Sequence, residues 1–176
     1  MDYKYKLNFY EVQGLKLLPN IIIDFVSSVI ANMESDDFVI NVDLSDNKII
    51  VRSDSDFKNV IDKFETNNLY GEYYEDEDAM EIVNEDGESM YILDTSSLTS
   101  KKLITTVIGD LIESAKHLII KGQDDYHNYY SWLSSIVIDM LNSEIIAKSE
   151  YSLYNSIERF ENSGLPYRYC STLSHE

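Results

Sequence analysis

The chain has 176 residues and 44% of them are hydrophobic, which suffices for one core and excludes a disordered polypeptide. Its 32 acidic and 14 basic residues give a formal net charge of −18. This charge argues against direct binding to nucleic acid or to an anionic membrane, and it favours a basic partner. The single cysteine, Cys170, excludes an intrachain disulfide framework and predicts a reducing, cytoplasmic location, or the host cytoplasm if the source is a phage.

The charge is distributed unevenly along the chain. Residues 1–95 hold 22 acids and 7 bases, a net charge of −15, whereas residues 96–176 hold 10 acids and 7 bases, a net charge of −3. We therefore divide the chain into an acidic α+β portion, 1–95, and a helical portion, 96–176. No breaker-rich linker separates the two portions, so we expect them to pack as one compact unit.

The acidic portion shows strand and helix periodicities in turn. Alternating apolar and polar residues predict strands, and apolar residues at helical spacing predict two helices. The expected elements are a strand over 3–9, a helix over 18–33 opened by Pro19, a hairpin of strands 38–44 and 48–52, a short helix over 57–64, a weak strand over 69–74, and strands 80–83 and 90–93 around a turn at 84–88. This order predicts an antiparallel sheet with two helices.

From Ser96 onward the apolar spacing favours helices. The first is expected to be capped by Ser97, Thr99 or Ser100 and to end before Gly122. A second is expected over 124–146 and a third over 149–161, followed by a loop after Pro166. The predicted fold class is therefore α+β, with a three-helix C-terminal half. No internal repeat is apparent.

The most unusual feature is an acidic tract. No basic residue occurs between Lys63 and Lys101, whereas eleven acids do. Rows of like charge on neighbouring strands are destabilising, and an ordinary soluble surface mixes the two signs. One interpretation is a solvated surface. The other is a site for a basic partner, formed by Glu72, Glu75, Asp76, Glu77, Asp78, Glu81, Glu85, Asp86 and Glu88.

Motifs for metal binding and catalysis are missing from the sequence. A calcium-binding loop starting at Asp43 would have Lys48 where glycine is required, and one starting at Asp76 would have Met80 at a ligand position. Nucleotide-binding glycine loops and a nucleophile elbow do not occur. We therefore expect no cofactor, no metal and no enzymatic activity.

The expected second helix is apolar on two sides, with Ile138 and Ile145 opposite its main stripe and Trp132 at the edge. Such a helix is either enclosed in a core or pressed against another chain. Core packing is the simpler interpretation. The alternative is a homo-oligomer interface at Trp132, Ile138 and Ile145.

The leading hypothesis is an acidic inhibitor that masks a basic surface of a partner protein, possibly a nucleic-acid enzyme. In composition the chain resembles phage-encoded nucleic-acid mimics and bacterial immunity proteins, although no motif carries the comparison. The alternative is a structural or chaperone-like protein that dimerises or holds a client through its helical half. A salt-sensitive affinity would favour the first hypothesis, because screening weakens attraction between charges.

Overall fold

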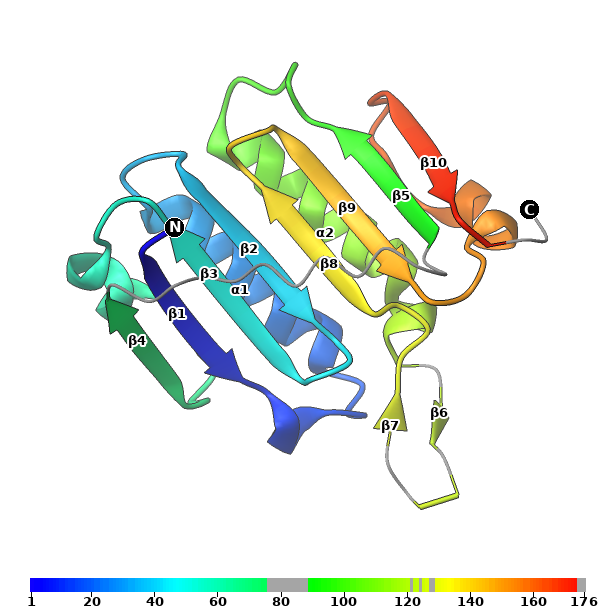
Figure 1. Cartoon of the computed structure of the whole chain (residues 1–176), viewed down its shortest axis with the longest axis horizontal. Coiled ribbons are helices and arrows are strands. Elements are labelled where there is room, and N and C mark those ends of the chain that lie inside the picture. The colour runs from blue at the N-terminus through cyan, green and yellow to red at the C-terminus, as the bar shows by residue number, and fades with distance from the viewer. Residues whose placement is uncertain (76–88, 121, 124, 127–128, 174–176) are drawn as a thin grey trace.

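The computed structural model describes residues 1–75, 89–120, 122–123, 125–126 and 129–173. Its main feature is an eight-stranded antiparallel sheet in the order β10-β5-β9-β8-β2-β3-β1-β4. Helices α1 and α2 lie side by side across one face of this sheet and are seen behind the strands in Figure 1. The opposite face is called the open face below.

The elements occur in the following order along the chain: β1 (Tyr3–Asn8), the 3-10 helix η1 (Tyr10–Val12), α1 (Leu18–Asn32), β2 (Phe38–Asp43), β3 (Lys48–Ser53), the 3-10 helix η2 (Lys58–Lys63), β4 (Gly71–Glu75), β5 (Ser89–Asp94), α2 (Lys101–Ile119), β6 (Gly122–Gln123), β7 (Tyr129–Tyr130), β8 (Ser135–Asp139), β9 (Glu144–Ser149), the 3-10 helix η3 (Tyr154–Arg159) and β10 (Tyr167–Ser171). The short strands β6 and β7 form a separate hairpin.

The core lies between the sheet and the two helices. Residues alternate along β2 and β3, so that every second side chain points at the helices and is buried. In β2 these are Phe38, Ile40 and Val42, all fully buried. From α1, Ile22 and Phe25 meet them at helical spacing. Each such side chain contributes roughly 1.5–3 kcal/mol by leaving water.

Both helices begin as the sequence indicates. Pro19 occupies the first turn of α1, where its missing N–H costs no hydrogen bond. Ser100 is the cap of α2, and its hydroxyl oxygen accepts a hydrogen bond from the backbone N–H of Leu103 at 3.2 Å. The predicted helix over 18–33 is confirmed, and of the three predicted caps, Ser97, Thr99 and Ser100, the structure shows Ser100.

The fold contains an internal repeat that the sequence did not reveal. The strand order is the same when read from either end, because β4-β1-β3-β2 of the first half corresponds to β10-β5-β9-β8 of the second. Each half has the order strand, α-helix, two strands, 3-10 helix, strand. The halves meet where β2 pairs with β8, and a pseudo-two-fold axis passes between Asn41 and Val137, which are paired there.

Equivalent residues are 86 positions apart up to the end of the α-helix and 96 positions apart after it. The ten-residue difference (96 − 86) corresponds to a longer connection in the second half, which contains the β6–β7 hairpin. Identical equivalent pairs include Tyr5/Tyr91, Leu7/Leu93, Ser28/Ser114, Asp43/Asp139, Ile49/Ile145, Ser53/Ser149, Phe64/Phe160, Glu65/Glu161 and Tyr73/Tyr169.

Hydrogen bonds repeat with these pairs. The Tyr73 hydroxyl accepts from the backbone N–H of Phe57 at 3.2 Å, and the Tyr169 hydroxyl accepts from Leu153 at the same distance. Likewise Ser28 accepts from the Glu65 N–H and Ser114 from the Glu161 N–H. The expectation of no repeat is therefore wrong. A single offset fails to align the halves, because the hairpin shifts it by ten residues.

The predicted three-helix C-terminal half is wrong. Among the residues described there, only α2 is an α-helix, and the expected helix over 124–146 is replaced by β7, β8 and the start of β9. The expected helix over 149–161 contains the end of β9 and the short η3, and the expected terminal loop contains β10. The helix expected over 57–64 is likewise the 3-10 helix η2.

The physical reason is that the buried apolar residues of this segment recur at every second position, which is typical of a strand and not of a helix. Ile136 and Ile138 alternate with Val137, and these β-branched residues favour an extended chain. Ser143 then turns the chain with a positive φ of 55°, as Asn47 does with 56° at the equivalent position in the first half. The predicted strand 80–83 and the turn 84–88 lie outside the described residues.

The charge-based division at residue 95 does not coincide with the repeat. Strand β5, within 1–95, pairs on both sides with strands of 96–176, namely β9 and β10. The two halves of the repeat instead meet in sequence between β4 and β5.

Two glycines offer a test of this packing. A Cβ on Gly71 would overlap the Tyr5 hydroxyl and ring, and Tyr5 cannot swing away because it packs against Phe25 and Phe64. We expect Gly71→Ala to destabilise the fold by ~1–3 kcal/mol. Gly109 lies inside α2, where a Cβ would be 3.9 Å from Ile23 Cγ2, an ordinary contact. We expect Gly109→Ala to stabilise it by up to ~1 kcal/mol.

Urea unfolding of both variants beside the parent chain measures these changes. A Gly71→Ala variant with the same free energy of unfolding as the parent chain would contradict the close contact between β4 and Tyr5.

Candidate functional site

The structure describes two of the nine acids in the predicted partner site. Glu72 and Glu75 are exposed on β4, at one end of the strand order. Hydrogen bonds from the hydroxyls of Tyr74 and Tyr70 lower the pKa of Glu72, so its carboxylate is readily ionised. The other seven predicted residues lie outside the described ranges: Asp76, Glu77, Asp78, Glu81, Glu85, Asp86 and Glu88.

The residues predicted as a possible oligomer interface have a different setting. Ile138 and Ile145 are each 1% exposed and pair with one another across β8 and β9, facing the core. Trp132 is half-buried, with its ring 5.0 Å from that of Tyr151. Two of these three side chains are thus in the core and are not presented to another chain.

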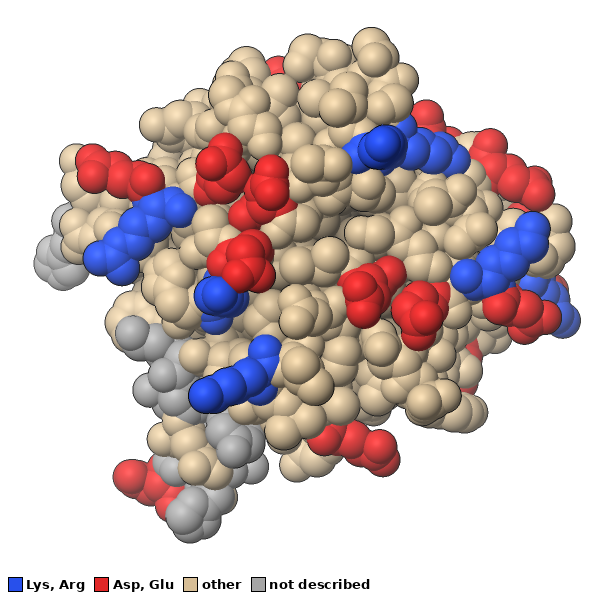
Figure 2. All heavy atoms as spheres, turned by 180° about the vertical axis from the view of Figure 1, so that it is seen from behind, with Lys and Arg blue, Asp and Glu red and all other residues tan. Residues whose placement is uncertain are grey.

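The two broad faces of the sheet mix positive and negative charges. On the face covered by the helices, Lys and Arg side chains are interspersed with Asp and Glu (Figure 2). On the open face, the charged side chains of the described strands are Lys4, Lys6, Lys48, Arg52, Lys148 and Arg168 together with Asp43, Glu72, Asp94, Asp139 and Glu144. As far as the described residues show, neither face is a uniform negative surface.

Carboxylates from three segments instead gather at one end of the first half. Asp37, just before β2, accepts hydrogen bonds from three serine hydroxyls: Ser53 at 3.1 Å, Ser55 at 2.5 Å, and Ser35. Burial acts to raise the pKa of Asp37, but the hydrogen bonds from these serines outweigh it and hold the pKa below its usual value. A carboxylate with a lowered pKa is a weak base, so Asp37 is better suited to holding charge than to removing protons.

Asp56 belongs to the same end of the molecule. Its Oδ1 accepts from the Tyr73 hydroxyl at 2.5 Å and from the backbone N–H of Lys58 at 2.9 Å. The Tyr73 hydrogen bond is the main cause of a lowered pKa at Asp56. Burial first, and then Asp56, raise the pKa of Tyr73, and Glu75 is close enough to add to this rise.

Asp54 and Glu34 complete the group. The backbone N–H of Asp54 donates to the Asp37 carbonyl at 3.2 Å, and the Asn59 side-chain amide donates to Glu34 at 3.4 Å. We call the set Glu34, Asp37, Asp54, Asp56 and Glu75 the acidic end. Positive groups are also near it, since the Met1 α-amino group lies 3.6 Å from Asp54 and Lys58 follows Asp56 closely in the chain.

A pocket of about 160 Å³ opens within the acidic end. Its apolar lining comes from Met33, Phe57 and Val60, and its polar lining from Glu34, Ser35, Ser53, Ser55, Asp56 and Asn59. Such a lining suits a positively charged group on an aliphatic stem, because carboxylates receive the charge and apolar atoms receive the stem. The second half repeats only part of this polar lining, since Ser149 and Asn155 match Ser53 and Asn59, whereas Tyr151 replaces Ser55 and Ser152 replaces Asp56. Tyr151 packs on Trp132.

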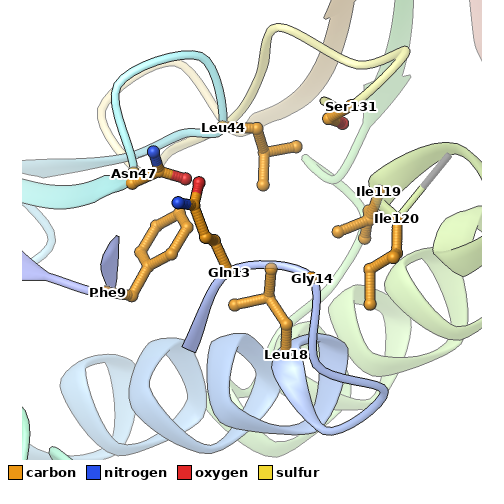
Figure 3. A pocket seen from close by; sticks show the side chains of 9 residues that line it. All are labelled: Phe9, Gln13, Gly14, Leu18, Leu44, Asn47, Ile119, Ile120 and Ser131. Atoms are coloured by element: carbon orange, nitrogen blue, oxygen red, sulfur yellow. The ribbon is translucent and has the colours of Figure 1, made fainter. Parts of the chain in front are cut away.

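The second cavity is smaller and lies where the start of α1 approaches the end of α2 (Figure 3). Its volume is about 20 Å³, enough for roughly one water molecule. Gln13 and Asn47 point toward each other at one side, and Leu18, Leu44 and Ile119 line the remainder (Figure 3). We assign this cavity a packing role only.

Over the described part of the chain, no three His, Cys, Asp or Glu side chains gather so as to hold a metal ion. The helices found in that same part are too short or too polar to cross a membrane. Comparison with known proteins adds no relative, because no family model, curated protein or solved structure matches this chain.

Sequence reasoning missed Glu34, Asp37, Asp54 and Asp56. They lie in two short runs of acid and serine, 34–37 and 53–56, and nothing in residue spacing shows that the end of α1, the end of β3 and the end of β4 meet. The signal present in the sequence is the density of serine beside acid in Ser53-Asp54-Ser55-Asp56.

The hydrogen bonds of Asp37 predict a pH-dependent stability. Because its pKa is lower in the folded than in the unfolded chain, the ionised form stabilises the fold above the unfolded pKa of about 3.9. This contribution is lost as the pH falls through the lowered folded value. We expect Asp37→Asn to cost about 1 kcal/mol at neutral pH and less at pH ~3.

Urea unfolding at both pH values measures the difference. Asp36→Asn is the matched control, because it removes the same charge from the exposed neighbouring residue. Equal losses for the two variants at both pH values would contradict the role given to the three serines.

Proposed function

We propose that this protein binds a basic surface of a partner protein and thereby masks it. The observation that carries the proposal is the meeting of five carboxylates from three chain segments at the acidic end, where two of them, Glu34 and Asp56, line an open pocket. With 32 acids and 14 bases in the chain, 18 carboxylates stay uncompensated even if every base forms an ion pair. Lowered pKa values at Asp37 and Asp56 keep two of the five ionised under mildly acidic conditions.

The partner class we propose is a protein whose basic surface normally holds nucleic acid. Such surfaces present Lys and Arg to phosphate rows, and a row of carboxylates competes for the same side chains. The seven further acids of the predicted partner site, between residues 76 and 88, follow Glu75 directly in the sequence. The mechanism is steric and electrostatic occupation, without chemistry.

The test is competition with labelled double-stranded DNA for a panel of purified basic nucleic-acid enzymes. We expect the protein to displace DNA from at least one enzyme. Its association rate should fall steeply as salt is added, because screening weakens steering by charge.

A charge-matched pair of variants separates a defined site from bulk charge. The site variant carries Glu34→Gln, Asp54→Asn and Glu75→Gln, and the control carries Asp24→Asn, Glu113→Gln and Glu158→Gln, all at exposed positions. Both lose three negative charges. We expect the site variant to associate at least about tenfold more slowly than the control.

A second variant tests the acids predicted from the sequence. Replacing Glu75, Asp76, Glu77 and Asp78 together by Ser should also slow association and leave the fold intact. If neither variant differs from its parent in displacement of DNA, the proposed site is wrong.

A further inference from the structure

The two outer strands of the sheet, β4 and β10, are equivalent under the pseudo-two-fold axis. Among the described strands, β4 pairs only with β1, and β10 pairs only with β5. Outer strands of this kind expose backbone donors and acceptors and can pair with a strand of another chain. Tyrosines are exposed beside both edges, Tyr70 by 70% and Tyr167 by 55%, and tyrosine is enriched at protein interfaces.

At equivalent positions of the two outer strands, the backbone N–H and C=O groups point in the same direction, either toward the neighbouring strand or away from the sheet. A hydrogen bond from Asn8 N–H to the Tyr70 carbonyl shows that residues 70, 72 and 74 direct their backbone groups at β1. Residues 71, 73 and 75 therefore direct theirs away from the sheet. The bond from Asp94 N–H to the Pro166 carbonyl fixes the same phase in β10, so that Tyr167 and Ser171 direct their backbone groups outward.

The two edges differ in charge at an equivalent position. Glu72 and Arg168 are 96 residues apart, both are exposed, and alternation places both on the open face. Within the chain, Arg168 contacts Glu144 at 3.2 Å and Lys6 lies near Glu72. These exposed pairs are weak and can accommodate a further partner.

From these observations we propose that a second copy of the chain adds to the sheet, with β4 of one copy antiparallel to β10 of the next. This arrangement places Glu72 opposite Arg168, and cross-strand pairs of opposite charge stabilise the pairing of two strands, whereas like charges directly opposite destabilise it. Pairing β4 with β4, or β10 with β10, would oppose like charges instead. Because each copy carries both complementary edges, the contact is heterologous and produces a ring or an open chain.

The contact is independent of the proposed masking function, and its test measures only the mass of the assembled protein. Sedimentation velocity at rising concentration should show species larger than the 20.4 kDa chain. We expect Glu72→Lys to abolish this association, since the variant has two positive edges. Arg168→Glu should also abolish it, since that variant has two negative edges.

The decisive measurement is a mixture of the two variants. In the mixture the two substituted edges, now of opposite charge, would face each other at one junction, and the unchanged Glu72 and Arg168 would face each other at the next. Association should therefore return to the level of the parent chain. Glu113→Lys makes the same change of charge on α2 and should associate like the parent. Circular dichroism shows whether each variant is folded. If a charge-reversed variant is not folded, the neutral variant at the same position, Glu72→Gln or Arg168→Gln, replaces it.

Several results would overturn the proposal. One is a parent chain that stays at 20.4 kDa at every concentration. Another is an oligomer that survives both single charge reversals. A third is a mixture of folded, monomeric variants that fails to associate.

Discussion

The pairing of β2 with β8 is the contact on which the remainder of the structure depends. It joins two four-stranded halves into one sheet, and it is closed at both ends by equivalent backbone hydrogen bonds, Leu44 N–H to Ser134 and Met140 N–H to Phe38. Ile40 pairs with Ile138 and Val42 with Ile136, all facing the helices. A single half with one helix would leave this row of apolar side chains at its edge in water. Joining the halves removes that cost and brings α1 against α2.

Comparison of the two halves of the repeat separates residues with a shared structural role from residues found in one half alone. Shared residues such as Tyr73 and Tyr169 perform the same structural task, because each hydroxyl accepts the same backbone hydrogen bond. Positions at which the two halves have different residues do not perform this shared structural task. In the first half, the three serines that donate to Asp37 line an open pocket, whereas in the second half Tyr151 packs on Trp132. The acidic end is therefore a property of one half and not of the fold as such.

Charge in this protein is organised by position within the fold. The open face of the sheet carries Lys4, Arg52 and Lys148 among its acids, and cross-strand pairing brings opposite charges together at Asp43 and Lys48. Such pairing is possible on a broad sheet, where each side chain has neighbours on both sides. At loop ends and strand ends there are fewer neighbours to compensate a carboxylate. Serine and tyrosine hydroxyls there stabilise charge by hydrogen bonding in place of an opposite charge.

The sequence by itself determined the elements with an unambiguous period and a clear boundary. The helix opened by Pro19, the hairpin turned at Asn47 and the cap at Ser100 are of this kind, since each depends on residues close together in the chain. Net charge also follows from composition alone, and the prediction of a basic partner rests on it. The local elements depend on residues close together in the chain, and net charge is a sum over residues, so neither depends on how distant segments are arranged in space.

Only the tertiary structure decided the second half and the candidate site. The apolar residues from Ile136 to Ile138 fit a helix or a strand, and pairing with β2 and β9 on either side selects the strand. The repeat became visible only through strand order, because an inserted hairpin shifts the alignment of its two halves. Glu34, Asp37, Asp56 and Glu75 come together because three separate segments end at one place. Contacts between distant segments carry no periodic signal, which is why these residues had to be found in space.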